Sequence, residues 1–112
     1  MARTPGEIAQ HHFQALAAGD AEMLFADYND QSVIVTPQGA FRGNRGIRQF
    51  WGGLFEELPN PKLEVISQTL EGQTLLLLWA AETDNGRVDG VDTFVFDEDG
   101  IRIQTVHHIK AA

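Results

Sequence analysis

The chain has 112 residues, 43% of them hydrophobic, which is enough for one hydrophobic core and predicts a single domain over residues 1–112. Sixteen acidic residues against eight basic ones give a formal net charge of −8, so neither nucleic acid nor a membrane surface is expected as a partner. The absence of cysteine excludes disulfides and thiol chemistry. Together with an N-terminus that lacks the apolar stretch of a signal peptide, it predicts a cytoplasmic protein.

The first predicted element is a helix whose start is marked by three residues. Thr4 is a typical N-cap, Pro5 occupies the first helical position, and Glu7 completes a capping box. Gly19 is expected to end this helix, and Asp20 to cap a second, short one.

Two short strands, 32–36 and 39–42, precede a third helix that Asn44 is expected to cap and that runs to residue 58. The apolar stripe of this third helix is the clearest helical pattern in the chain. The pair Gly52-Gly53 interrupts it at a cost of about 1 kcal/mol per glycine relative to alanine. Close packing and a simple bend are both possible reasons for the pair.

Everything after the third helix is predicted to be strand, over 62–71, 73–83, 88–97 and 101–110. Helices followed by an antiparallel meander predict an α+β fold with three helices packed on the sheet. Residues 75–81 are apolar at both strand parities, which predicts a sheet covered on both faces. Because three helices can cover only one face, a homodimer is the simplest assembly.

The last hairpin carries the candidate site. Since strand residues alternate between faces, Asp92 shares an apolar face with Phe94. If residues 99–100 form a two-residue turn, Asp92 lies opposite His107; a slip of two residues keeps both on one face, and a slip of one does not. The predicted apolar face of the returning strand consists of Ile101, Ile103, Thr105, His107 and Ile109.

A carboxylate and an imidazole on an apolar face are costly unless they are paired or used in chemistry. Asp92 could be an acid with a raised pKa or the partner that orients His107. It could also be a buried carboxylate satisfied by backbone amides, Arg42 or Arg48. His107 could be a general base or a hydrogen-bonded core histidine.

His12 lies on the inward side of the first helix, as a third candidate or as an edge-of-core histidine. Two histidines and a carboxylate also form the ligand set of non-haem iron sites, but the chain has no H-x-H or H-x-x-x-H spacing, so neither a metal nor a cofactor is predicted. The expected cavity lining, for which ordinary core packing is the competing explanation, is Trp51, Phe55, Phe94, Thr105 and Ile109.

Several segments together resemble a known family. They are 15–20 (Ala-Leu-Ala-Ala-Gly-Asp), 35–37 (Val-Thr-Pro), 41–51, and 90–96 with 99–101. In this order and spacing they resemble the nuclear-transport-factor-2-like superfamily, and within it the SnoaL-like branch, over nearly the whole chain. The resemblance implies a cone-shaped fold with a strongly curved, mainly antiparallel sheet. It also implies a relation to ketosteroid isomerases, polyketide cyclases, epoxide hydrolases, dehydratases and non-catalytic domains, so fold fixes little about function.

Carried over position by position, the resemblance assigns roles to a few residues. Asp92 stands where ketosteroid isomerase-like proteins keep a protonated aspartic acid that donates to a substrate oxyanion. His12 stands at their phenol donor, and Thr36 at their general base. Threonine cannot take a carbon-bound proton, so steroid isomerisation by that mechanism is not expected. The arginine-x-aspartate pair of the epoxide hydrolases reads Glu82-Thr83-Asp84 here, without the arginine, and their last-strand aspartate corresponds to His107.

These observations predict a homodimeric, cofactor-independent enzyme. Asp92 and His107 would perform acid–base chemistry on a small, mainly apolar carbonyl or hydroxyl compound, and His12 would polarise an oxygen. Isomerisation, cyclisation and dehydration all remain open. The alternative is a non-catalytic ligand-binding or dimerisation module of the same fold, which the threonine at position 36 favours.

Overall fold

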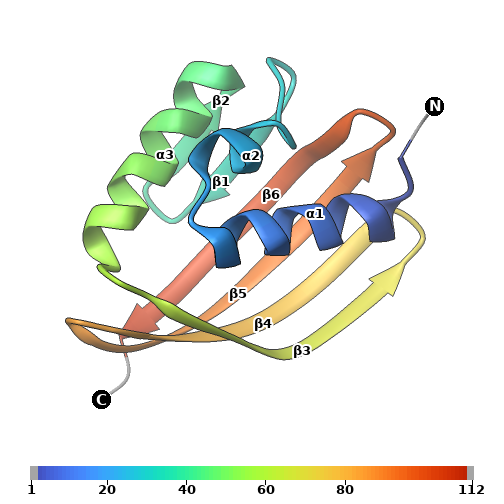
Figure 1. Cartoon of the computed structure of the whole chain (residues 1–112). Helices are drawn as coiled ribbons and strands as arrows, with labels where there is room; N and C mark the ends of the chain where they lie inside the picture. The colour runs from blue at the N-terminus through green and yellow to red at the C-terminus, as the bar shows by residue number, and fades with distance from the viewer. Residues whose placement is uncertain (1–2, 111–112) are drawn as a thin grey trace.

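The computed structural model describes residues 3–110, which form an α+β fold of three helices and six strands (Figure 1). In chain order the elements are α1 (Pro5–Ala18), α2 (Ala21–Phe25), β1 (Val33–Thr36), β2 (Gly39–Arg42), α3 (Gly43–Glu57), β3 (Lys62–Glu71), β4 (Thr74–Thr83), β5 (Gly86–Asp97) and β6 (Gly100–Lys110). Among these described residues no helix is both long and apolar enough to cross a membrane.

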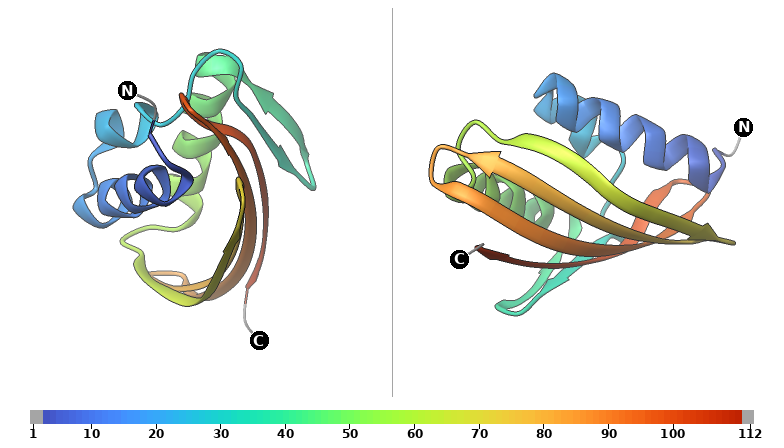
Figure 2. Two further views of the ribbon diagram at one scale, coloured as in Figure 1. Left: turned by 90° about the vertical axis from the view of Figure 1, so that its right-hand side faces the viewer. Right: turned by 90° about the horizontal axis from the view of Figure 1, so that it is seen from below.

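The strands form one curved sheet in the order β2-β1-β6-β5-β4-β3. β1 runs parallel to β6, and every other neighbouring pair is antiparallel. The three helices lie on the concave side of this sheet (Figure 2). The predicted α+β class and the mainly antiparallel sheet are confirmed.

Local sequence signals explain the first two helices. The Thr4 side chain accepts a hydrogen bond from the Glu7 amide, and the Glu7 carboxylate accepts one from the Thr4 amide, which is the predicted capping box. Gly19 ends α1 with a left-handed φ of 65°, and the Asp20 side chain caps α2 through the Met23 amide.

The start of α3 differs from the prediction. The helix begins at Gly43, and Asn44 lies inside it rather than capping it. Asp30, in the segment before β1, accepts a hydrogen bond from the Asn44 amide at 3.1 Å. This cap comes from a residue distant in sequence, so no local pattern announces it.

The two faces of the sheet differ in what covers them. On β4, Leu75 and Leu77 are buried on the concave face beneath the helices, while Leu76 and Leu78 point to the convex face and are 42% and 39% exposed. None of the three helices packs on the convex face (Figure 2). The predicted apolar character of both faces is therefore present, with only the concave face covered within the chain.

The register of the β5–β6 hairpin is the main correction to the sequence analysis. Glu98-Asp99, not Asp99-Gly100, forms the two-residue turn, because Asp97 pairs with Gly100. A β-bulge then places Phe96 opposite Ile101 but Val95 opposite Ile103, leaving Arg102 as the extra residue. The net slip of one residue puts Asp92 opposite Val106 instead of His107.

Candidate functional site

A cavity of about 90 Å³ lies between α1, α3 and the concave face of the sheet. Most of its lining is aliphatic or aromatic. The polar groups that it contains include His12 from α1, Asp92 from β5 and Gln104 from β6. Apolar residues at its outer rim are partly exposed, among them Phe55 (43%), Leu63 (47%) and Val65 (47%).

Asp92 is buried in this cavity, and both of its carboxylate oxygens accept a hydrogen bond. Trp79 Nε1 donates to Oδ1 at 2.9 Å, and Gln104 Nε2 donates to Oδ2 at 2.9 Å. Gln104 is held in turn by the Tyr28 hydroxyl, which donates to its Oε1. The sequence also allowed Arg42, Arg48 or backbone amides as partners of Asp92. In the described part of the chain the partners are instead Trp79 and Gln104.

The environment of Asp92 has two opposing effects on its ionisation. Burial raises its pKa to about 6, while the hydrogen bonds from Trp79 and Gln104 and the nearby His108 oppose the rise. A group with this pKa is mostly ionised at pH 7. Asp92 is therefore a carboxylate acceptor at neutral pH, whereas the resemblance to ketosteroid isomerases implied a protonated donor.

Gly90 explains how Trp79 reaches Asp92. The two residues are opposite each other on β4 and β5, and a Cβ at position 90 would lie 2.1 Å from Cε2 of the Trp79 indole. The absence of a side chain lets the indole lie over the β5 backbone, with its N–H directed at the carboxylate two residues further along. The hydrogen bond from Trp79 to Asp92 therefore depends on a glycine at position 90.

His12 is 2% exposed and is enclosed by aromatic rings. Its ring centroid lies 5.4 Å from that of Phe94, 5.9 Å from Trp51 and 6.0 Å from Tyr28. Burial lowers the pKa of His12 to about 4, with Asp27 acting in the opposite direction, so the imidazole is neutral at pH 7. The prediction that His12 points inward is confirmed.

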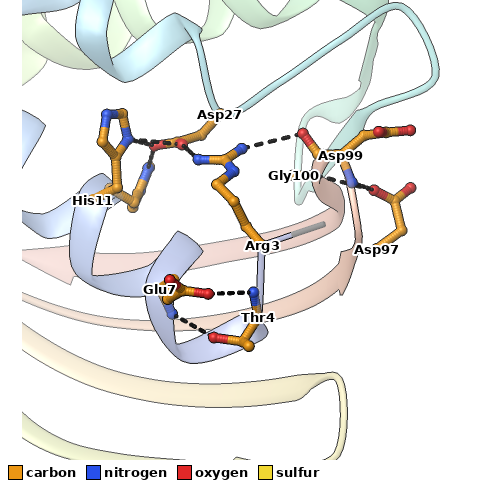
Figure 3. Close-up of polar contacts among 9 residues, drawn as sticks. Arg3, Thr4, Glu7, His11, Asp27, Asp97, Asp99 and Gly100 are labelled. Atoms are coloured by element: carbon orange, nitrogen blue, oxygen red, sulfur yellow. Dashed lines mark hydrogen bonds and ion pairs between the residues drawn. The ribbon is translucent and has the colours of Figure 1, made fainter. Parts of the chain in front are cut away.

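Asp27 is the centre of a second polar cluster, in which Arg3 and His11 contact its carboxylate (Figure 3). Its carboxylate is fully buried. Arg3 Nη1 donates to Oδ1 at 2.8 Å, and His11 Nδ1 lies 2.8 Å from Oδ2. Arg3 also donates to the Asp99 carbonyl, and the Ile101 amide donates to the Asp27 carbonyl at 2.8 Å. The cluster therefore joins α1, the segment after α2 and the β5–β6 turn.

The structure divides the predicted site residues into two groups. Asp92, His12, Trp51, Phe55 and Phe94 line the cavity. The β5–β6 bulge turns the other predicted residues to the exposed convex face. The predicted pairing of Asp92 with His107 is therefore wrong, and so are the predicted cavity positions of Thr105 and Ile109. These convex-face residues are Thr105, His107 and Ile109.

The same bulge explains why the sequence did not indicate two polar residues of the concave side. Gln104 and His108, expected to point outward, lie on the concave side, where Gln104 bonds Asp92 and the His108 ring lies 6.0 Å from the Trp79 ring. The sequence did not show which face of the sheet Trp79 occupies, and Asp27 lies in a polar stretch that is typical of a protein surface.

Over residues 3–110, no group of three or more His, Cys, Asp or Glu side chains is arranged to hold a metal ion.

A curved, mainly antiparallel sheet with three helices on its concave side is the fold of nuclear-transport-factor-2-like proteins. The family model of the SnoaL-like domain matches residues 9–106, so the chain belongs to the SnoaL-like domain family. Among curated proteins, none matches the chain significantly.

Solved structures of similar fold share little sequence with this chain. A protein from Burkholderia xenovorans, described as NTF-2 like and of unknown function, has a TM-score of 0.80 at 18% identity, covering 96% of this chain and 84% of its own. One from Shewanella denitrificans, described provisionally as a SnoaL-like polyketide cyclase, has a TM-score of 0.77 at 17% identity, covering 94% of this chain and 90% of its own. TerC, co-crystallised with polyporic acid, has a TM-score of 0.78 at 15% identity, with 92% and 89% covered.

Proposed function

We propose that the protein is a cofactor-independent acid–base enzyme that acts on a small, mainly apolar carbonyl or hydroxyl compound, with Asp92 as its general base. The observation that carries this proposal is a carboxylate with a pKa of about 6 inside an apolar cavity. A base whose pKa lies near the working pH combines a large ionised fraction with useful basicity. Such perturbed groups in cavities are typical of functional sites.

The hydrogen bonds to Asp92 suit a proton-transfer role. Each carboxylate oxygen has two lone-pair positions, and Trp79 and Gln104 occupy one on each oxygen. Either of the two remaining positions can take a proton from a substrate C–H or O–H. The proton then returns to a different substrate atom in an isomerisation or cyclisation, or to the departing hydroxyl in a dehydration.

The cavity limits the size of the buried part of the substrate. Its volume of about 90 Å³ is smaller than the roughly 150 Å³ of an engineered cavity that binds benzene. A larger molecule would extend over the apolar rim of Phe55, Leu63 and Val65. The polyporic acid complex of TerC, which has a similar fold, supports a small organic ligand for this cavity.

Proton exchange tests the proposed base without knowledge of the natural substrate. Small ketones such as cyclopentanone would be incubated in deuterated buffer, and hydroxyketones would be screened for dehydration products by mass spectrometry. We expect the native protein to accelerate exchange next to the carbonyl, and Asp92→Asn to lose at least about 100-fold of that acceleration. Asp89→Asn, which removes an exposed carboxylate from the same strand, should retain it. Equal exchange by native protein and Asp92→Asn would refute the base assignment.

One observation favours the second candidate, a non-catalytic ligand-binding module. Thr36, where the resemblance places a general base, lies at the β1–β2 turn, and its hydroxyl bonds Gln38 and Gly39. This candidate predicts that ketones bind, as judged by shifts of the cavity resonances, while no exchange is accelerated.

We also infer a homodimer built on the convex face. Apolar residues of four strands are exposed there without a helix over them, which is the kind of surface that a second copy would cover. These residues include Val35, Leu76, Leu78, Val91, Ile103 and Ile109.

A further inference from the structure

Asp27 lies next to Nδ1 of His12 and is not among the residues that line the cavity. His12 Nδ1 is buried, has no hydrogen-bond partner in the described part of the chain, and lies 3.9 Å from Asp27 Oδ2. This distance is too long for a hydrogen bond but short enough for a strong charge–dipole interaction. We propose that Asp27 is a positioning residue that holds His12 in the Nδ1–H tautomer, so that the cavity selects ligands with a hydroxyl donor.

The charge that sets the tautomer is fixed by the surrounding cluster. Asp27 is completely buried, and the Arg3 guanidinium lies 2.8 Å from its Oδ1. His11 Nδ1 lies 2.8 Å from both carboxylate oxygens. The guanidinium supplies a permanent positive charge beside this buried carboxylate. His12 therefore faces a fixed anion across a short gap.

A neutral imidazole carries its proton on one nitrogen and a lone pair on the other. With Nδ1 toward Asp27, the Nδ1–H form directs a bond dipole at the anion, whereas the Nε2–H form directs a lone pair at it. The first arrangement is attractive and the second repulsive. Asp27 consequently favours the tautomer that free histidine populates less.

The other titratable groups around His12 preserve this preference. His11 precedes His12 on the same helix, and its own Nδ1 lies against Asp27. The Tyr28 phenol, packed on the His12 ring, stays neutral because burial raises its pKa well above the ordinary value. The cavity lining contains two acids, the exposed Glu64 on β3 and Asp92, whose carboxylate is bound by Trp79 and Gln104. Asp27 is the only one of these groups paired with His12 Nδ1.

The tautomer determines what the cavity recognises. Since Nδ1 is buried on the Asp27 side, Nε2 is the ring nitrogen left for the cavity that His12 lines. In the Nδ1–H tautomer, Nε2 accepts a hydrogen bond and cannot donate one. An alcohol, phenol or enol satisfies it, whereas a ketone without a donor leaves the lone pair unpaired. His12 thus acts as an acceptor, not as the oxygen-polarising donor expected from the sequence.

Nitrogen-15 NMR of the histidine side chains measures the tautomer directly. At pH 7 we expect His12 of the native protein to show a protonated Nδ1 and an unprotonated Nε2. Asp27→Asn should shift the population toward Nε2–H. Asp30→Asn, which neutralises another acid of the same segment, should leave it unchanged. A native protein with His12 in the Nε2–H form overturns the proposal, even if Asp27→Asn does not fold.

Ligand preference supplies an independent readout. Cyclopentanol and cyclopentanone have the same number of heavy atoms and differ in whether the oxygen can donate. We expect the native protein to bind the alcohol at least tenfold more tightly, and His12→Phe to lose this preference. Equal affinities, or a preference for the ketone, would overturn the ligand assignment.

This inference rests on the proposed function only in assuming that the bound ligand is also a substrate. The tautomer of His12 and the ligand affinities are measured without a reaction. If the exchange assay fails but His12 has the expected tautomer, the proposed catalysis is refuted and the role of Asp27 as a positioning residue stands. The expected exchange with the opposite tautomer removes the role of Asp27 and leaves Asp92 as the base.

Discussion

Asp92 and His12 line the same cavity, and burial displaces their pKa values in opposite directions. The pKa of Asp92 rises to about 6, and that of His12 falls to about 4. The folded protein therefore holds a proton on Asp92 more tightly than the unfolded chain does, and holds one on His12 less tightly. The stabilising contribution of Asp92 is complete at low pH and is lost as the pH rises to about 6. That of His12 is complete above its ordinary pKa and is lost as the pH falls to about 4.

These two contributions oppose each other between about pH 4 and pH 6 in the native protein. We expect the unfolding free energy of Asp92→Asn to rise with pH in this window more steeply than that of the native protein, because His12 is then unopposed. The difference in unfolding free energy between Asp92→Asn and the native protein should change by roughly 2–3 kcal/mol from about pH 4 to about pH 6. In His12→Gln the free energy should instead fall as the pH rises. Urea unfolding at several pH values measures both, and native and Asp92→Asn curves that run parallel would contradict the expectation.

At the scale of elements, the sequence predicted what local chemistry determines. The caps of α1 and α2 lie within three residues of the groups that they bind, so Thr4 and Asp20 could be recognised without a fold. The strand ranges follow from turn residues in the same way. The cap of α3 is different, because Asp30 reaches Asn44 only after the chain has folded.

The β5–β6 bulge shows why the site could be predicted only in part. Its extra residue, Arg102, donates to the Gln31 carbonyl in the segment before β1, so a partner distant in sequence accompanies the bulge. Alternation placed Asp92 correctly because β5 is regular up to that residue. It failed for Gln104 and His107 because a single inserted residue reverses every side chain beyond it.

The glycines of α3 allow a prediction at the same scale. Gly52 and Gly53 are exposed, and a Cβ at either position would meet no atom within 4 Å, so close packing does not explain them. Gly53→Ala should raise the unfolding free energy by about 0.5–1 kcal/mol, because alanine loses less backbone entropy in a helix. Gly46→Ala in the same helix should lower it, since its Cβ would lie 2.9 Å from the Phe41 carbonyl carbon. Thermal and urea unfolding measure both. A destabilised Gly53→Ala would show that the helix needs the glycine.

At the scale of the molecule, two different surfaces expose apolar side chains. On the concave side they line the cavity, where Phe55, Leu63 and Val65 are partly exposed. On the convex side they form a broad patch across the sheet, and the bulge adds His107 and Ile109 to that face. A net charge of −8 keeps separate copies apart in solution unless burial of this patch outweighs the repulsion.

The convex patch predicts a specific effect of charge on assembly. Leu78 is 39% exposed on the convex face of β4, and a glutamate there would be buried without a partner if two sheets packed together. We expect the native protein to sediment as a dimer and Leu78→Glu as a folded monomer. Leu70→Glu changes a similarly exposed leucine (45%) on the opposite face, at the end of β3, and should remain dimeric. Sedimentation velocity, with circular dichroism to check folding, separates these outcomes. A native monomer, or a Leu78→Glu variant that stays dimeric, would exclude the convex face as the interface, since a sheet-to-sheet contact cannot accommodate an unpaired buried carboxylate at its centre.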